Sequence, residues 1–200
     1  VLGCGTSAFV AESFAALREG AGFGMTDAAY ASEPWPWRDY DAVVVLSRSG
    51  TTTEAIAALD GLPDGVRVIA VTGVADSPVA ERADEVLLLD FADEESVVQT
   101  RFPTTFLVLA RSALGEDVSG LPAEAEAALA QPLGLDTASL EHFVYLGSGW
   151  TYGLAQEAAL KIREAAQAWA ESYPLLDYRH GPLAVAGETS LVWIIGRSEP

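Results

Sequence analysis

Short apolar runs alternate along the chain with stretches whose apolar residues recur at helical spacing. Continuous apolar runs of this length are typical of strands that are buried on both faces of a parallel sheet. The predicted strands are Val1–Leu2, Ala42–Leu46, Val66–Val71, Glu85–Leu89, His142–Leu146 and Leu191–Ile195. The predicted helices are Ala8–Glu19, Thr52–Asp60, Pro78–Ala83, Ser96–Leu114, Ala123–Ala130 and Leu154–Trp169. This alternation predicts an α/β fold of three αβα layers around a doubly wound parallel sheet.

Two features interrupt the pattern. Pro103 lies inside the predicted helix Ser96–Leu114, and because proline has no backbone N–H it would have to kink or restart that helix. Residues 115–138 replace the apolar runs with glycine, proline and acidic residues, which indicates an interdomain connection. We therefore expect a first domain at residues 1–118, a linker at 119–138 and a second domain at 139–200.

The second domain begins as the first one does. LGCGTSAFVAESFAALRE at residues 2–19 and LGSGWTYGLAQEAALKIR at 146–163 share an L-G-x-G turn that leads into an alanine-rich helix. This repeat indicates two tandem copies of one α/β domain, the second incomplete. Val1 opens inside an apolar strand and Pro200 closely follows another, so we expect this chain to be a fragment of a longer one.

Charge and composition exclude several classes of partner. The 29 acidic and 11 basic residues give a formal net charge of −18 at pH 7. The electrostatic field of this negative charge would repel nucleic acid and anionic membranes. A small anionic ligand needs a site with a local positive potential. No apolar run approaches the ~20 residues of a membrane span and no basic leader precedes the first strand, which predicts a cytoplasmic protein. The single cysteine, Cys4, fits a reducing compartment and is interpreted as a small turn residue.

The stretch LSRSGTTTE at residues 46–54 follows a predicted strand and carries five hydroxyl side chains. Thr51 and Glu54 have the spacing of a capping box, which predicts a helix that begins near Thr52. Ser47, Ser49 and Thr52 exceed what capping needs, and hydroxyls on a loop at a helix N-terminus favour an anion. The loop lacks the Gly-Lys-Ser/Thr ending of a Walker loop, so a monophosphate suits it better than a nucleoside triphosphate.

The sequence lacks the complete motifs of a nicotinamide cofactor site and of a metal site. Gly3-Cys4-Gly5 follows a strand, but Ala8 stands where the dinucleotide fingerprint has its third glycine, so a nicotinamide enzyme is disfavoured. The sequence has no His, Cys and Asp cluster with the spacing of metal ligands. We expect no metal and no organic cofactor.

Five motifs taken together resemble the sugar isomerase (SIS) domain family. They are GCGTS at 3–7, SRSGTTTE at 47–54, EESVVQTRF at 94–102, GSGWTYGLAQEAALKIRE at 147–164 and YRHGPLA at 178–184. The resemblance spans essentially the whole chain and is nearest to tandem proteins: the isomerase half of the glucosamine–fructose-6-phosphate aminotransferases and the amino-sugar-phosphate isomerase/deaminases. It implies a flavodoxin-like SIS fold in two copies.

The resemblance also implies roles for the motif residues. Ser47, Ser49 and Thr52, with the backbone of Arg48, would bind the phosphate of a sugar phosphate. Thr6, Ser7, Val97 and Gln99 would face the sugar. Gln99 and Arg101 stand where the family has serine and lysine, and this departure leaves the exact sugar open.

The second domain would supply the acid–base groups. Glu157, Lys161, Glu164 and Ala168 form one stripe of the predicted helix, which in an anonymous helix would be a surface salt-bridge ladder. By resemblance Glu164 would move the proton between C1 and C2 and Lys161 would assist at the oxygen or imine. His180 would open the sugar ring from a neighbouring subunit, which implies a homodimer. His142 matches no motif and is interpreted as structural.

Three functions remain open on this sequence. The first is an aldose–ketose isomerase of a hexose or hexosamine 6-phosphate, with or without removal or transfer of an amino group. The second is the isomerase half of a glutamine-dependent aminotransferase, which would need a separate glutaminase domain. The third is a non-catalytic sugar-phosphate sensor, which would have no reason to retain the acid–base set.

Overall fold

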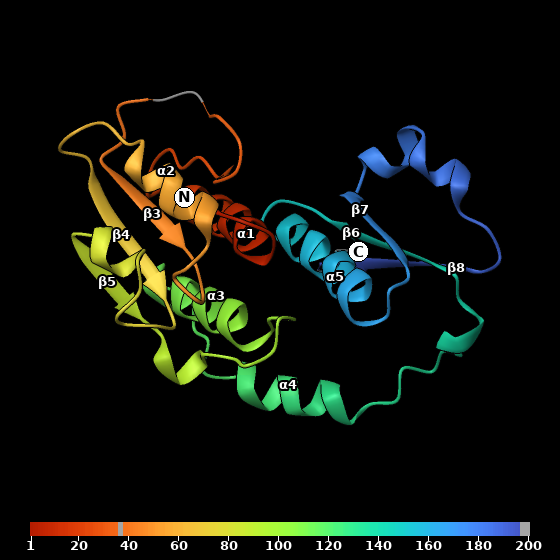
Figure 1. Cartoon of the computed structure of the whole chain (residues 1–200). Coiled ribbons are helices and arrows are strands. Elements are labelled where there is room, and N and C mark those ends of the chain that lie inside the picture. The colour runs from red at the N-terminus through yellow and green to blue at the C-terminus, as the bar shows by residue number, and fades with distance from the viewer. Residues whose placement is uncertain (36–37, 197–200) are drawn as a thin grey trace.

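The first half of the chain forms a five-stranded parallel sheet in the order β2-β1-β3-β4-β5 (Figure 1). The computed structural model describes residues 1–35 and 38–196. The strands are β1 (Leu2–Gly3), β2 (Ala29–Tyr30), β3 (Ala42–Leu46), β4 (Arg67–Thr72) and β5 (Glu85–Leu88). The helices are α1 (Thr6–Gly20), α2 (Thr53–Asp60) and α3 (Arg101–Ala113), with short 3₁₀ turns η1 (Ala80–Arg82) and η2 (Asp90–Ala92).

Both faces of this sheet are covered by helices. Val43 and Val45 of β3 point into a core that contains Ala55 and Leu59 of α2. Leu46 of β3 joins a second core with residues of α1 and α3. Neighbouring strand residues point to opposite faces, so a continuous apolar run such as AVVVL buries both. The doubly wound α/β fold expected from the sequence is confirmed.

The second half forms a three-stranded parallel sheet in the order β7-β6-β8. Its strands are β6 (His142–Gly147), β7 (Trp169–Pro174) and β8 (Ser190–Ile195), with α5 (Thr151–Ala165) packed on one face. The 3₁₀ turns η4 (Asp177–His180) and η5 (Pro182–Val185) follow β7, and Tyr178 of η4 packs on the other face.

The two sheets lie on either side of a connection that contains α4 (Leu121–Ala130) and the 3₁₀ turn η3 (Thr137–Ser139). No residue of α4 is buried, and Figure 1 shows this helix at the lower edge of the view, below α3 and α5. The domain boundaries at residues 118 and 138 stay predictions.

The structure corrects three predicted elements. Helix α3 begins at Arg101, not Ser96, and Pro103 lies in its first turn, where a helix needs no N–H donor. Helix α5 ends at Ala165, because Gln167 adopts a left-handed backbone with φ of 52° and Trp169 then pairs with His142 as the first residue of β7. Within residues 78–83 only Ala80–Arg82 form a 3₁₀ turn, and β2 and β7 are strands that were not predicted.

Helices α1 and α5 hold the two halves together and run in opposite directions. Ser13 Oγ donates to Trp150 O at 2.8 Å near one end of the pair, and Thr6 meets Glu157 and Lys161 near the other. A Cβ atom at Gly153 would lie 2.2 Å from Ser13 Oγ and 2.3 Å from Phe9 O. This glycine therefore permits the close crossing on which the site below depends.

Candidate functional site

The first element of the site is the L-G-x-G turn, and the structure shows the same turn in both halves. A Cβ atom at Gly3 would meet the backbone of Ser7 at 2.5 Å, and one at Gly147 would meet Thr151 O at 2.2 Å. Gly5 and Gly149 have φ values of 53° and 55°, a backbone that favours glycine. Because β1 and β3 are adjacent parallel strands, the turn after β1 and the loop after β3 open on the same edge of the sheet.

The second element is the loop at residues 47–52, which we call the hydroxyl loop. Ser47 is buried, and its Oγ lies 3.0 Å from Thr52 Oγ1. Ser49 Oγ accepts hydrogen bonds from Thr51 N (3.3 Å) and Thr51 Oγ1 (2.9 Å). Gly50 has a φ of 65°, and a Cβ atom there would lie 2.0 Å from Ser77 Oγ. The loop is thus a tight turn that gathers its hydroxyls ahead of the N-terminus of α2.

The predicted capping box of this loop is wrong. The N-cap of α2 is Thr52, one residue later than that motif requires, and it makes no side-chain cap hydrogen bond. Thr51 bonds to Ser49 instead, and Glu54 accepts from Thr53 Oγ1 at 2.9 Å. The hydroxyls therefore bond to one another within the loop and do not cap the helix.

The third element is a charged cluster where α5 meets the first turn of α1. Lys161 Nζ lies 2.6 Å from Glu164 Oε2, 3.2 Å from Glu157 Oε1 and 3.1 Å from Thr6 Oγ1. Thr6 Oγ1 in turn donates to Glu157 Oε1 at 3.2 Å. The structure therefore joins Thr6 of the first half to Lys161 and Glu164 of the second half, three residues that the sequence analysis had placed in one site.

Glu157 completes this cluster and was not among the predicted site residues. Burial raises the pKa of its carboxyl, and the ammonium of Lys161 opposes that shift. Its Oε2 atom is buried and has no hydrogen-bond partner among the described residues. The spacing of Glu157 four residues before Lys161 was visible in the sequence, but its contact with Thr6, 151 residues away, was not.

The other predicted residues lie outside these contacts. Ser7 is buried in the first turn of α1. Val97 is 84% exposed, and Gln99 is half-buried with its Oε1 atom unpartnered among the described residues. His180 is exposed at the end of η4, and no hydrogen bond or ion pair of the described residues joins it to Lys161 or Glu164. Figure 1 shows the segment at 177–185 well separated from α1.

His142 and Cys4 have the surroundings of structural residues. His142 is buried, stacks on Trp169 and contacts Ser190 Oγ (3.0 Å) and Glu171 Oε2 (2.9 Å), so that it links the three strands of the second sheet. Burial, and to a smaller extent the charge of Glu54, raises the pKa of the Cys4 thiol, which disfavours the reactive thiolate.

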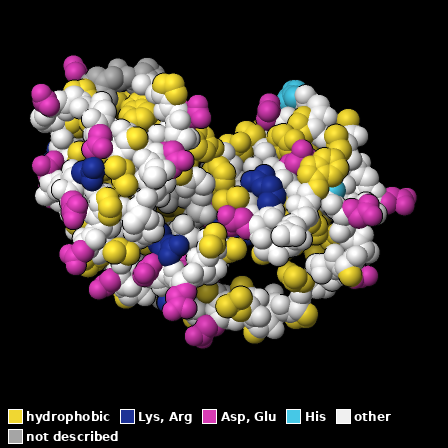
Figure 2. Space-filling model, viewed as in Figure 1, with side chains coloured by type: hydrophobic (Ala, Val, Ile, Leu, Met, Phe, Trp, Pro, Cys, Tyr) yellow, Lys and Arg dark blue, Asp and Glu magenta, His cyan; other side chains and the backbone are white. Residues whose placement is uncertain are grey.

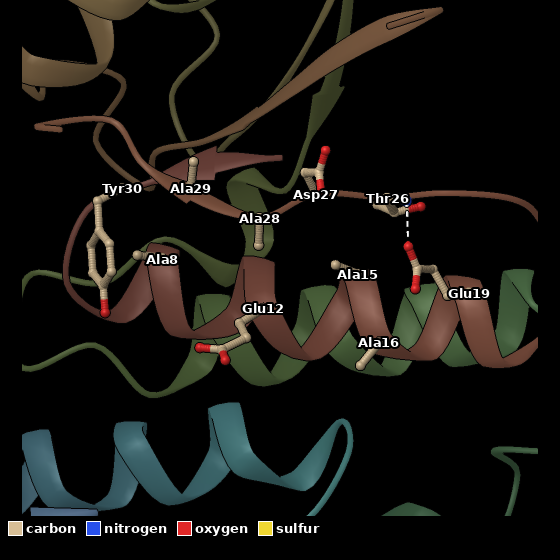
Figure 3. A pocket seen from close by; sticks show the side chains of 10 residues that line it. All are labelled: Ala8, Glu12, Ala15, Ala16, Glu19, Thr26, Asp27, Ala28, Ala29 and Tyr30. Carbon is tan, nitrogen blue, oxygen red and sulfur yellow. Dashed lines mark hydrogen bonds between the residues drawn. The ribbon is translucent and has the colours of Figure 1, made fainter. Parts of the chain in front are cut away.

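A cavity on another face of α1 does not suit an anion. Glu12, Glu19, Asp27 and Tyr30 line it, and its lining contains no lysine or arginine (Figure 3). Burial raises the pKa of Glu12, which Gln156 partly opposes by hydrogen bonding. Acidic side chains are spread over the visible face of the molecule (Figure 2). The hydroxyl loop and Lys161 therefore suit an anionic ligand better than this acidic cavity does.

The part of the chain that the structure describes contains neither a metal-binding cluster nor a membrane-spanning helix. No group of three or more His, Cys, Asp or Glu side chains there is arranged to hold a metal ion. No helix among residues 1–35 and 38–196 is long and apolar enough to cross a membrane.

Comparison with known proteins gives consistent matches. The family model described as "SIS domain" matches residues 1–113. The glutamine–fructose-6-phosphate aminotransferase [isomerizing] of Clostridium acetobutylicum is 33% identical over 178 residues, which cover 77% of this chain and 29% of that protein. The chain thus spans less than a third of that relative.

Solved structures resemble the whole chain. A glucosamine-6-phosphate deaminase from Thermotoga maritima superposes with a TM-score of 0.86 at 27% identity, covering 98% of this chain and 67% of that one. A tagatose-6-phosphate ketose/aldose isomerase from Escherichia coli gives a TM-score of 0.82 at 21% identity, covering 100% and 62%. The second likeness concerns the fold alone.

Proposed function

This chain belongs to the SIS domain family, and we propose that it binds a hexose or hexosamine 6-phosphate and catalyses its aldose–ketose isomerisation. The observation that carries the proposal is the cluster of Lys161 with Glu157, Glu164 and Thr6, which unites side chains of both halves. A non-catalytic sensor would have no use for a lysine held between two carboxylates.

The hydroxyl loop supports a phosphate as the anchor. It follows β3 at the carboxyl edge of a parallel sheet, where ligands of doubly wound folds bind. Free N–H groups at the start of α2 and the hydroxyls of Ser47, Ser49 and Thr52 can hydrogen-bond to phosphate oxygens. A phosphate group that is bound away from the reacting carbons supplies binding energy that can lower the barrier at those carbons.

The charged cluster supports proton transfer. Moving a proton between adjacent carbons through an enediol requires a carboxylate base and a proton donor for the oxygens. Glu164 takes the first role in the proposal, and Lys161, whose ammonium is within 2.6 Å of it, takes the second. The carboxyl of Glu157 and the hydroxyl of Thr6 fix the position of that ammonium.

Glu164→Gln tests the base. The substitution keeps the size of the side chain and removes its proton acceptor, so isomerisation of the accepted 6-phosphate should fall by about 10²–10⁴-fold. Binding of the same sugar phosphate, measured by calorimetry, should change little. Glu126→Gln, on helix α4, in which no residue is buried, is the matched control. Full activity in the Glu164 variant would eliminate it as the base.

Replacing both Ser49 and Thr52 with alanine tests the phosphate anchor. Each lost hydrogen bond to a charged group should cost about 1.5–3 kcal/mol, so the loss of both should weaken binding of the sugar phosphate by at least about a hundredfold. Binding of the unphosphorylated sugar should stay as it was. An equal loss for both ligands would indicate that the loop is only structural.

A reaction that transfers or releases an amino group is the second candidate function, and the activities of two similar proteins favour it. One relative is an aminotransferase and one neighbour a deaminase of glucosamine 6-phosphate. An ammonia-release assay with glucosamine 6-phosphate separates the two reactions, because simple isomerisation of a hexose 6-phosphate releases none.

A further inference from the structure

Three segments converge at the carboxyl edge of the first sheet. They are the hydroxyl loop after β3, the turn at Gly73 after β4 and the segment at residues 89–94 after β5. Arg48 O accepts hydrogen bonds from Gly73 N (2.8 Å) and Thr72 Oγ1 (3.2 Å). A Cβ atom at Gly73 would lie 3.2 Å from both Arg48 O and the side chain of Asp93. The three segments are therefore in direct contact, with little space between them.

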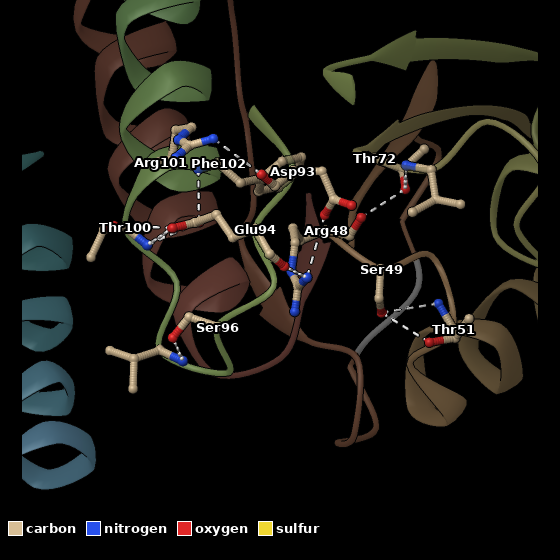
Figure 4. A network of polar contacts seen from close by, with 12 residues as sticks. Arg48, Ser49, Thr51, Thr72, Asp93, Glu94, Ser96, Thr100, Arg101 and Phe102 are labelled. Atoms are coloured by element: carbon tan, nitrogen blue, oxygen red, sulfur yellow. Dashed lines mark hydrogen bonds and ion pairs between the residues drawn. The ribbon is translucent and has the colours of Figure 1, made fainter. Parts of the chain in front are cut away.

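The side chain of Arg48 connects the first segment to the third (Figure 4). Its Nη1 donates to Asp93 Oδ1 at 3.3 Å and to the backbone carbonyl of Glu94. The side chain is only 18% exposed, and its Nε is buried without a partner among the described residues. Because this guanidinium is mostly enclosed and already donates to two acceptors on one segment, it is not free to turn toward a ligand.

The carboxylate of Glu94 closes the next stretch of chain into a loop. It accepts hydrogen bonds from Thr100 N (2.9 Å), Thr100 Oγ1 (3.0 Å) and Phe102 N (3.1 Å), at the start of α3. The residues between, 95–99, form neither helix nor strand and include Val97 and Gln99. One end of this loop, at Glu94, is thus bonded to Arg48.

We propose that the side chain of Arg48 is a positioning group that ties the hydroxyl loop to the loop at residues 94–100 and does not itself bind the ligand's phosphate. Filling the hydroxyl loop with a phosphate group would then hold Val97 and Gln99 in place against the rest of the ligand. This second part of the proposal rests on the proposed function, whereas the tie itself does not. Through this connection, the choice of sugar by Val97 and Gln99 would depend on whether a phosphate group occupies the hydroxyl loop.

Hydrogen–deuterium exchange with and without ligand tests the proposal. In Arg48→Gln without ligand, amides of Thr100 and Phe102 should exchange about tenfold faster than in the wild type, because charge-assisted hydrogen bonds are lost. The Kd for inorganic phosphate should stay within about threefold, while that for glucosamine 6-phosphate should rise by about tenfold. Arg67→Gln, which breaks an exposed pair with Glu85 on the same sheet, is the control and should change none of the three.

The outcomes separate the tie from the proposed function. Unchanged exchange in Arg48→Gln would overturn the tie, and an equal loss of affinity for inorganic phosphate and for glucosamine 6-phosphate would make Arg48 a direct phosphate ligand. If the wild type binds neither anion, the proposed function and the coupling to phosphate both fail, and exchange without ligand still decides the tie. Arg48→Lys, which keeps the charge but not the forked donors, should show a smaller increase in exchange and serves if the glutamine variant does not fold.

Discussion

At the scale of single residues, the environment of Glu94 makes the stability of the fold depend on pH. Burial alone would raise the pKa of its carboxyl, but hydrogen bonds from the backbone N–H groups of residues 100–102 and from the Thr100 hydroxyl outweigh burial and hold the pKa below its usual range. A carboxyl with a lowered pKa in the folded state stabilises the protein above its ordinary pKa. That stabilisation is lost as the pH falls through the lowered value.

Glu94→Gln should remove this contribution. We expect the free energy of unfolding to fall by about 1 kcal/mol near pH 7, as for a lost helix cap, and to depend less on pH in the acid range. Urea unfolding from neutral pH down to about pH 3 measures both effects. The exposed neighbour Glu95 is the control, since Glu95→Gln should alter neither. A Glu94 variant that loses stability on acidification as steeply as the wild type would contradict the assignment.

At the residue scale, the sequence shows a surplus of hydroxyls at residues 47–52, and their binding of a phosphate stays a prediction. The capping box in the same loop was wrong, because Thr51 bonds to Ser49 and the N-cap is Thr52. The contact between Thr6 and Lys161 could be expected only through the family resemblance. Glu157 was missed because its distinguishing contact, with Thr6, is made by folding alone.

At the scale of elements, the crossing of α1 and α5 positions the charged cluster, and Gly153 permits that crossing. Gly153→Ala would place a Cβ atom 2.3 Å from the backbone oxygen of Phe9, which cannot rotate away, so the helices must separate. We expect a loss of about 1–3 kcal/mol in unfolding free energy, as for an overpacked interface, together with lower activity. Denaturant unfolding and an activity assay measure the two effects.

Gly20→Ala is the matched control for this substitution. Gly20 also lies in an α-helix, but a Cβ atom there would have nothing within 4 Å. Because alanine has the higher helix propensity, this variant should be as stable as the wild type or more so. Equal stability of the two variants would mean that α1 and α5 do not depend on close contact.

Element prediction was accurate for the strands that carry a continuous apolar run, missed β2 and β7, and was poor at helix ends. β3 begins and ends as predicted, and β4 is displaced by one residue, because a buried strand is marked by a continuous apolar run. The start of α3 and the end of α5 depend on tertiary contacts instead. Glu94 caps α3 from outside the helix, and pairing with His142 makes Trp169 the start of a strand. Neither partner is adjacent in sequence.

At the scale of the whole molecule, His180 raises the question of a second subunit. It is exposed, and among the described residues no hydrogen bond or ion pair joins it to Lys161 or Glu164. The family resemblance implies that this histidine acts in the site of a neighbouring copy. Each site of a homodimer would then combine Glu164 of one subunit with His180 of the other.

Mixing two inactive variants tests this arrangement. Glu164→Gln and His180→Ala dimers, mixed, unfolded and refolded together, should form hybrids in which one of the two sites keeps both native residues. Because half of the random dimers are such hybrids, about a quarter of the wild-type activity should return. Mixing Glu164→Gln with Lys161→Ala is the control: both residues lie on α5 of the same subunit, so no hybrid regains an intact site. Activity that stays absent from the first mixture, although hybrids form, would require each His180 to serve its own chain or none.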